Sequence, residues 1–181
     1  MANKDKITLG SGKLYCVEYD GAIPEDAVIE IEDNRLGYIS GGATLEYTPT
    51  FYEAKDDLGY VSKTILTQEE AKLKSGVMTF NGDTLTKLCS TGRVTETEGK
   101  RTVLIGGAGN QDGKSYIIRF VHNDPVDGDV RVTIVGRNEA GFSLSYAKDK
   151  ETVIDAEFKA LAKLDTDGTL IKYEETIPAA E

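Results

Sequence analysis

The chain has 181 residues, of which 39% are hydrophobic and 29% charged, enough for one domain over residues 1–181 with a sizeable core. The net charge of -10 argues against a nucleic-acid-binding protein, because phosphate affinity comes mainly from Lys and Arg. Cys16 and Cys89 are too few for a disulfide framework and are expected to be free thiols. The polar start Met1–Lys6 and the lack of a long apolar run predict neither a secretory signal nor a membrane helix.

The N-terminal third predicts a strand and then a long projection. Leu14–Tyr19 alternates as a strand does, and residues 43–54 alternate again after Gly41 and Gly42. Pro49 cannot donate to a β-ladder, so the second run is expected at a sheet edge or in an extended segment. Residues 41–66 therefore predict a projecting loop or arm.

The middle of the chain predicts the helical content. Thr67–Glu70 has capping-box spacing, which predicts one helical turn, and Leu73–Phe80 predicts a strand. Asn81-Gly82-Asp83 opens a predicted helix that ends at Gly92. Its expected buried face holds Leu85, Leu88 and Cys89.

The second half predicts strands almost throughout. Arg137–Gly141 is predicted to be a hairpin turn and Asp165–Gly168 another turn, while residues 175–181 are expected to be a flexible end. About eight to ten strands at short spacing predict a mainly β fold, a β-sandwich or barrel with one flanking α-helix and a long extended loop. The predicted strands are Thr102–Ile105, Ser115–Val121, Val130–Val135, Phe142–Ala147, Val153–Ala162 and Thr169–Glu174.

Motifs for chemistry are weak in this sequence. Ala108–Ser115 nearly matches a phosphate-binding loop, but the residues after it alternate as a strand, so no helix N-terminus would face a phosphate. Lys163–Glu174 resembles a calcium loop with Lys163 in place of the first carboxylate. A pairing of Cys89 with the single histidine, His122, lacks a third orienting group. The sequence therefore predicts no catalytic, metal or cofactor site, and no enzyme.

Three stretches resemble the tail tube (major tail) proteins of long-tailed bacteriophages, in particular those of Gram-positive hosts. They are Lys74–Leu88, the run Val130–Phe142, and Lys148–Ala160 followed by an Asp-rich turn and Thr169-Leu170-Ile171. The likeness extends over residues 10 to 175 in the expected order. It is a likeness of fold and spacing, since none of the three stretches is a catalytic signature.

The resemblance implies a structural protein of the virion that forms six-fold rings, stacked into a hollow tube through which DNA leaves. Assembly would take place in the bacterial host cytoplasm. Its partners would be further copies of itself and the tail tip or baseplate, tape measure and terminator proteins, with transient passage of DNA and no membrane. The projecting loop would join subunits, and lumen carboxylates would repel phosphates. The expected inter-subunit contacts are Glu46, Tyr47, Phe51, Tyr52, Lys55, Asp56 and Asp57. Candidates for the lumen are Asp155 and Glu157, with Glu46 on the same alternating polar face.

Two other functions stay open at this point. The tube of a contractile tail-like particle, such as a bacteriocin or a secretion tube, would share the sandwich-and-helix plan. A monomeric ligand-binding β module could use some of the nine tyrosines as a sugar platform, although the chain has no Trp.

Overall fold

A computed structural model describes residues 8–176. The polar start Met1–Lys6 and residues 177–181 of the expected flexible end lie outside the described residues. Residues 175 and 176 do not form a loose end, because Glu175 closes β10 and the Thr176 amide donates to the Asp129 carbonyl.

The described residues form a mainly β fold, as the sequence predicts. All strand pairs are antiparallel, and one large sheet has the order β2-β1-β7-β8-β9-β4-β3, with β10 paired to β8. A separate hairpin joins β5 to β6. The strands are β1 Lys13–Glu18, β2 Arg35–Gly37, β3 Ile39–Lys55, β4 Ser62–Val77, β5 Arg93–Thr97, β6 Lys100–Leu104, β7 Tyr116–His122, β8 Val130–Asn138, β9 Ile154–Ala160 and β10 Lys172–Glu175.

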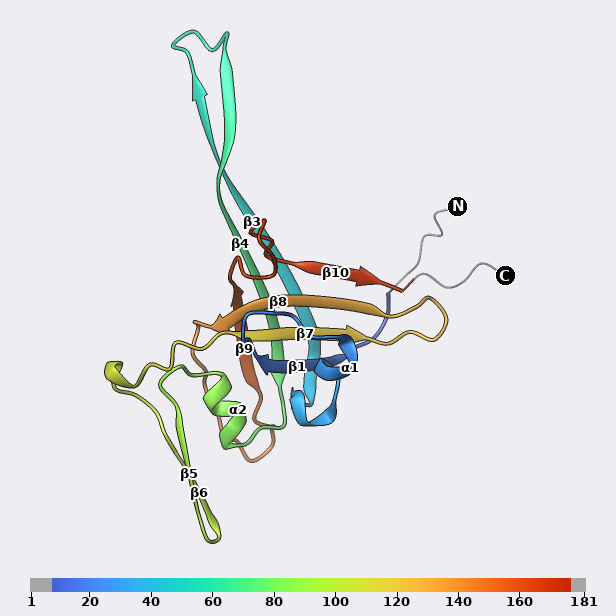
Figure 1. The fold of residues 1–181 in the computed structure, drawn as a ribbon, viewed down its shortest axis with the longest axis vertical. Coiled ribbons are helices and arrows are strands. Elements are labelled where there is room, and N and C mark those ends of the chain that lie inside the picture. The colour runs from blue at the N-terminus through green and yellow to red at the C-terminus, as the bar shows by residue number, and fades with distance from the viewer. Residues whose placement is uncertain (1–7, 177–181) are drawn as a thin grey trace.

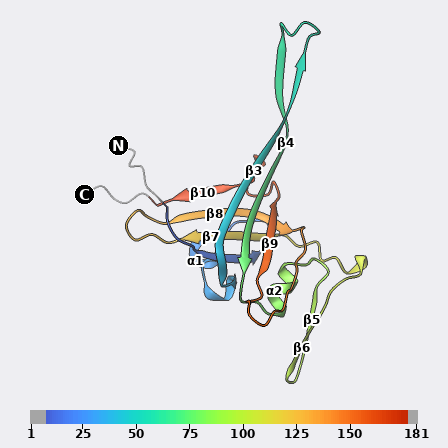
Figure 2. The ribbon, with the colours of Figure 1, turned by 180° about the vertical axis from the view of Figure 1, so that it is seen from behind.

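The large sheet bends between β8 and β9, so that β9, β4 and β3 cross over β1, β7 and β8 (Figures 1 and 2). The main core fills the space between these two layers, in the manner of a sandwich. Alternate side chains of β9 and β4 fill this core. Strand β9 buries Ile154, Ala156 and Phe158 in it, and β4 buries Leu73 and Val77.

A second, smaller apolar cluster lies on the outer side of β1, β7 and β8. The helix α1 (Asp26–Ile29) covers it and buries Ile29 against Ile117 and Val135. Because β7 and β8 are covered on both faces, they are buried almost continuously and show no simple alternation. The four-residue helix α1 has no sequence signal of its own and is a second helix beyond the single one predicted.

The predicted middle helix is present as α2 (Gly82–Lys87), although it ends at Lys87 and not at the predicted stop, Gly92. The Asn81 side chain accepts from the Asp83 and Thr84 amides and closes a capping box. Leu88 is buried at its end, while Leu85 and Cys89 are half-buried.

Three local predictions are wrong. Thr67–Glu70 is not helical, because Gln68 to Glu70 pair with β3 inside β4 and Thr67 is the bulged residue beside them. Phe142–Ala147 forms no strand, so Arg137–Gly141 is a turn with a left-handed Gly141 but not a hairpin. Residues 41–66, expected as a projecting loop or arm, belong to the long hairpin of β3 and β4. Strands β2 and β5 were not predicted.

Candidate functional site

The hairpin of β3 and β4 extends far beyond the rest of the molecule (Figures 1 and 2). The neighbouring strand β9 pairs only with Lys72 to Val77 of β4, so the outer part of the hairpin has no third strand. Residues 48–69, here called the arm, are all exposed. An isolated two-stranded ribbon is marginally stable in water, so an arm of this length gains by contact with another surface.

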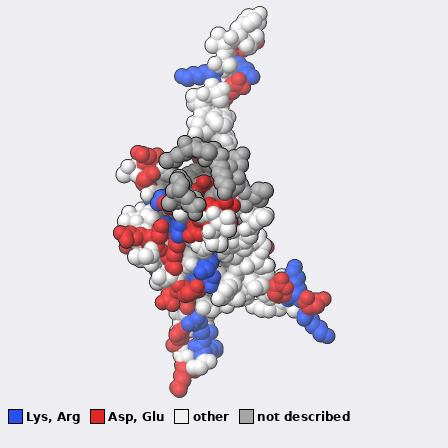
Figure 3. All heavy atoms as spheres, turned by 90° about the vertical axis from the view of Figure 1, so that its right-hand side faces the viewer, with Lys and Arg blue, Asp and Glu red and all other residues white. Residues whose placement is uncertain are grey.

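Apolar side chains lie on both faces of the arm. Phe51 pairs with Leu66 and Tyr52 with Ile65, and these two adjacent pairs point to opposite sides of the ribbon. The four side chains are between 46% and 59% exposed. The face of the arm seen in Figure 3 is largely free of charged side chains, except for a band below its tip. A cluster of exposed apolar side chains in a thin projection is typical of a protein–protein contact.

Two irregularities set the register of the β3–β4 hairpin. At the base, Gly41 and Gly42 form a bulge with positive φ angles of 80° and 75°, and Ser75 Oγ donates to the Gly42 carbonyl over 2.9 Å. Further out, Thr67 is unpaired between Gln68 and Leu66. Bulges of this kind increase the local twist of a ribbon.

Asp56 closes the tip of the arm. Its side chain accepts from the Val61 amide at 2.7 Å and the Leu58 amide at 3.3 Å, and these bonds hold the pKa of its carboxyl below the ordinary value. Gly59 takes the left-handed conformation that the turn requires. The turn leaves Tyr60 82% exposed, with its hydroxyl available to a partner.

The predicted inter-subunit residues therefore divide between the arm and its base. Phe51, Tyr52, Lys55, Asp56 and Asp57 lie on the arm, where Lys55 pairs with Glu53 over 3.0 Å. Tyr47 and Glu46 lie at its base, next to the body. The Tyr47 hydroxyl donates to Glu69 at 2.5 Å, and this bond raises the Tyr47 pKa.

The predicted lumen carboxylates lie on the polar face of β9, away from the arm. Glu157 contacts Lys72 at 3.0 Å and Lys74 at 3.4 Å, and Lys74 also contacts Glu46 at 2.8 Å. The bond to Lys72 holds the pKa of Glu157 below its ordinary value. Lys72 and Lys159 both bind Glu70 as well, so this face is a ladder of alternating charges.

Asp155 is the exposed carboxylate beside this ladder. It lines an open cavity of about 520 Å³ under the Gly41-Gly42 bulge, together with Ser75, Gly76 and Glu157. Of the predicted carboxylates, only Asp155 makes no ion pair among the described residues. A ladder in which lysines neutralise glutamates presents much less negative charge than the sequence pattern alone suggests.

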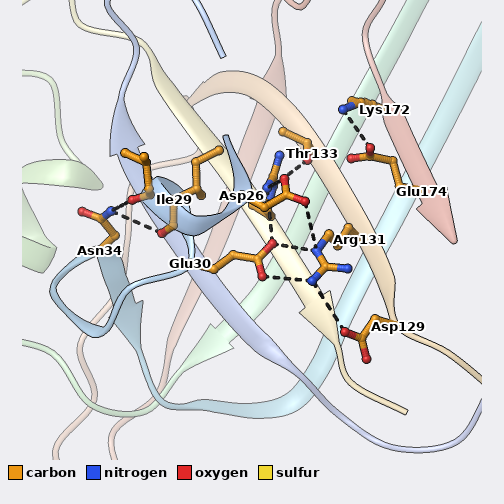
Figure 4. A network of polar contacts seen from close by, with 11 residues as sticks. Asp26, Ile29, Glu30, Asn34, Asp129, Arg131, Thr133, Lys172 and Glu174 are labelled. Carbon is orange, nitrogen blue, oxygen red and sulfur yellow. Dashed lines mark hydrogen bonds and ion pairs between the residues drawn. The ribbon is translucent and has the colours of Figure 1, made fainter. Parts of the chain in front are cut away.

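Sequence reasoning missed a cluster of buried charges under α1 (Figure 4). Arg119 of β7 is fully buried; its Nε donates to Thr133 Oγ1 at 3.0 Å and its Nη1 contacts Asp26 and Glu30. Glu30 also accepts from Arg131 Nε at 2.7 Å. The available sequence signals for this cluster were an arginine inside an alternating strand and two acidic residues in and next to a short helix. Only the fold brings these residues together.

In the structure, the residues of the other candidate motifs have different partners and do not form the sites that the motifs suggest. Lys114 contacts Glu18 at 2.6 Å and is followed by β7, so Ala108–Ser115 has no helix N-terminus to hold a phosphate. His122 Nδ1 lies 2.7 Å from the Ser11 carbonyl, and Cys89 Sγ contacts Thr91 Oγ1. Burial raises the pKa of the Cys16 thiol to about 12, which leaves it protonated at neutral pH.

Asp165 of the Asp-rich turn accepts from the Asp167 and Thr169 amides. Within residues 8–176, no group of three or more His, Cys, Asp or Glu side chains is placed to hold a metal ion. No helix in the same part of the chain has the length and apolar character needed to span a membrane.

Comparison with protein-family models and with curated proteins found no match for this chain. The functional argument therefore depends on the residues and the geometry described above.

Proposed function

We propose that this chain is a self-assembling structural subunit, and that its assembly is the tail tube of a long-tailed phage. The arm is the observation that carries the proposal. It holds its apolar pairs Phe51–Leu66 and Tyr52–Ile65 away from the body on a ribbon with no partner of its own. Burying side chains of this kind contributes about 1.5–3 kcal/mol each, so contact with a second copy would stabilise both the arm and the assembly.

The sheet edges support the same proposal. Strands β2 and β3 terminate the large sheet, and neither has a second neighbour among the described residues. Open edges tend to recruit further strands, and a closed ring of subunits removes them by pairing each edge with the next copy. A head-to-tail contact between subunits that closes on itself gives a ring, and a second contact along the ring axis stacks such rings into a tube.

The charge of the chain suits a tube that passes DNA. A net charge of -10 repels phosphates overall. The ladder of Glu46, Lys74, Glu157 and Lys72 ties its lysines to carboxylates, and paired lysines hold passing phosphates less strongly than free ones. Both features favour passage of DNA over retention.

Shortening the arm tests the proposal. Pro49 and Glu69 are paired, so replacing residues 50–68 with Asn-Gly should close a short hairpin without touching the core. The variant should fold with unchanged thermal stability and remain monomeric in sedimentation velocity at concentrations where the full chain associates.

A point-substitution pair provides the matched control. The double variant Phe51→Ser, Leu66→Ser should lose association. Val126→Ser, Tyr146→Ser, which changes two still more exposed hydrophobic residues off the arm, should keep it. Equal association of the two double variants would contradict the role of the arm. A monomeric full chain that binds a glycan would instead favour a ligand-binding module.

A further inference from the structure

An open cavity of about 540 Å³ lies between the segment leading into α1 and strand β10. We call it the Arg119 pocket. Its walls are residues 23–27 on one side and Lys172 and Glu174 on the other, and Arg119 also lines it. Ile23 and Pro24 give one wall an apolar surface. The cavity can therefore hold a side chain with an apolar stem and a polar end.

Two polar atoms of this pocket have no hydrogen-bond partner among the described residues. Arg119 Nη2 is buried and lacks an acceptor, although Nε and Nη1 of the same group are fully engaged. Glu174 Oε2 is buried and lacks a donor, while Oε1 binds Lys172 at 2.8 Å. An unmade hydrogen bond on a buried charged group is unfavourable, so both atoms favour a ligand.

The charges around the pocket select the kind of ligand. Glu25, Asp26 and Glu174 line it together with two cations, Arg119 and Lys172, and both cations already bind carboxylates. A further anion would be repelled by the excess carboxylate. A neutral hydroxyl offers both the acceptor that Arg119 Nη2 lacks and the donor that Glu174 Oε2 lacks. The ligand that fits is thus an uncharged phenol or alcohol.

We propose that the Arg119 pocket receives Tyr60 from the arm tip of a second copy of this chain. The inference rests on the proposed self-assembly and names the surface that the arm tip meets. Tyr60 is 82% exposed and carries a phenol hydroxyl, and its ring matches the apolar wall at Ile23 and Pro24. The tip of the arm is remote from α1 of the same chain (Figures 1 and 2), so the pocket is filled by another copy.

Tyr60→Phe tests the contact because it removes only the hydroxyl. Loss of the hydrogen bonds to two charged groups should raise the concentration for half-maximal association about tenfold, measured by sedimentation velocity or light scattering. Tyr146→Phe, at a site 78% exposed and outside the pocket, is the matched control and should associate as the wild type does.

Filling the pocket tests the other side of the contact. Ala27→Trp places a bulky group in the pocket and should block association, whereas Val28→Trp on the same helix lies outside the pocket lining and should not. Circular dichroism should show both variants folded. Association unchanged by Tyr60→Phe or by Ala27→Trp contradicts this contact alone. A wild-type chain that never associates contradicts the proposed function and this contact together.

Discussion

At the scale of single residues, the buried charges under α1 explain how a four-residue helix stays in place. Such a helix cannot persist by itself, since helix formation is costly to nucleate. Glu30 receives bonds from both Arg119 and Arg131, and Asp26 contacts both as well. These bonds attach α1 over the apolar cluster around Ile29. They also fix Arg119 at the wall of its pocket.

Glu30→Gln should therefore destabilise the fold by about 2 kcal/mol, because it leaves the buried guanidinium group of Arg119 and the half-buried one of Arg131 with weaker partners. Urea unfolding followed by circular dichroism measures the change. Glu25→Gln is the matched control: its side chain is exposed, makes no ion pair among the described residues, and should change stability by less than about 0.5 kcal/mol. Equal effects of the two would contradict the role of Glu30.

Glu157 makes stability depend on pH in a predictable direction. Its folded-state pKa lies below the ordinary value of 4.5, since Lys72 binds the carboxylate. The carboxylate thus stabilises the fold above pH 4.5, and this contribution is lost as the pH falls through the lowered pKa. Melting temperature should fall less steeply below pH 4.5 in Glu157→Gln than in the wild type. Asp155→Asn, which removes a carboxylate without an ion pair, should keep the wild-type slope.

At the scale of elements, the bend between β8 and β9 creates the sandwich. Gly136 lies where β8 leaves β10 and begins to pair with β9. A Cβ at this position would lie 2.2 Å from the Lys159 carbonyl oxygen, so the two strands can approach closely only because Gly136 has no side chain. The bend lets β9, β4 and β3 cover the core side of β7 and β8.

Gly136→Ala should accordingly destabilise the fold by about 3 kcal/mol, because the clash is with backbone and cannot be relieved by a side-chain rotation. Thermal unfolding measures the effect. Gly109→Ala is the control: a Cβ there has open space around it, and stability should be unchanged. A Gly136→Ala protein as stable as the control would show that the strands can separate without cost.

Sequence periodicity predicted the strands whose side chains alternate between apolar and polar. It failed for elements whose secondary structure depends on contacts with distant parts of the chain. The run Ala43–Ala54 and the Asn81 cap carry local signals, and both elements are present. Thr67–Glu70 has helix-capping spacing, yet pairing with β3 overrides that local preference. Helix α1 and the Arg119 pocket depend on contacts between residues about 90 positions apart, which no local pattern reveals.

At the scale of the whole molecule, the body and the arm differ in how they treat apolar side chains. The body buries its apolar residues in two clusters on either side of β1, β7 and β8. The arm keeps the alternating pattern of a buried strand but has nothing to bury it against. Alternation and Pro49 predicted an extended edge segment at this place. They could not predict that β4 would pair with it along its whole length.

Electron microscopy of the purified full-length chain across a concentration series tests the central claim most directly. The account predicts rings or tubes of uniform bore, forming at high concentration or when a tail tip complex is added as initiator. A chain that stays monomeric at every concentration, with and without that complex, would contradict it.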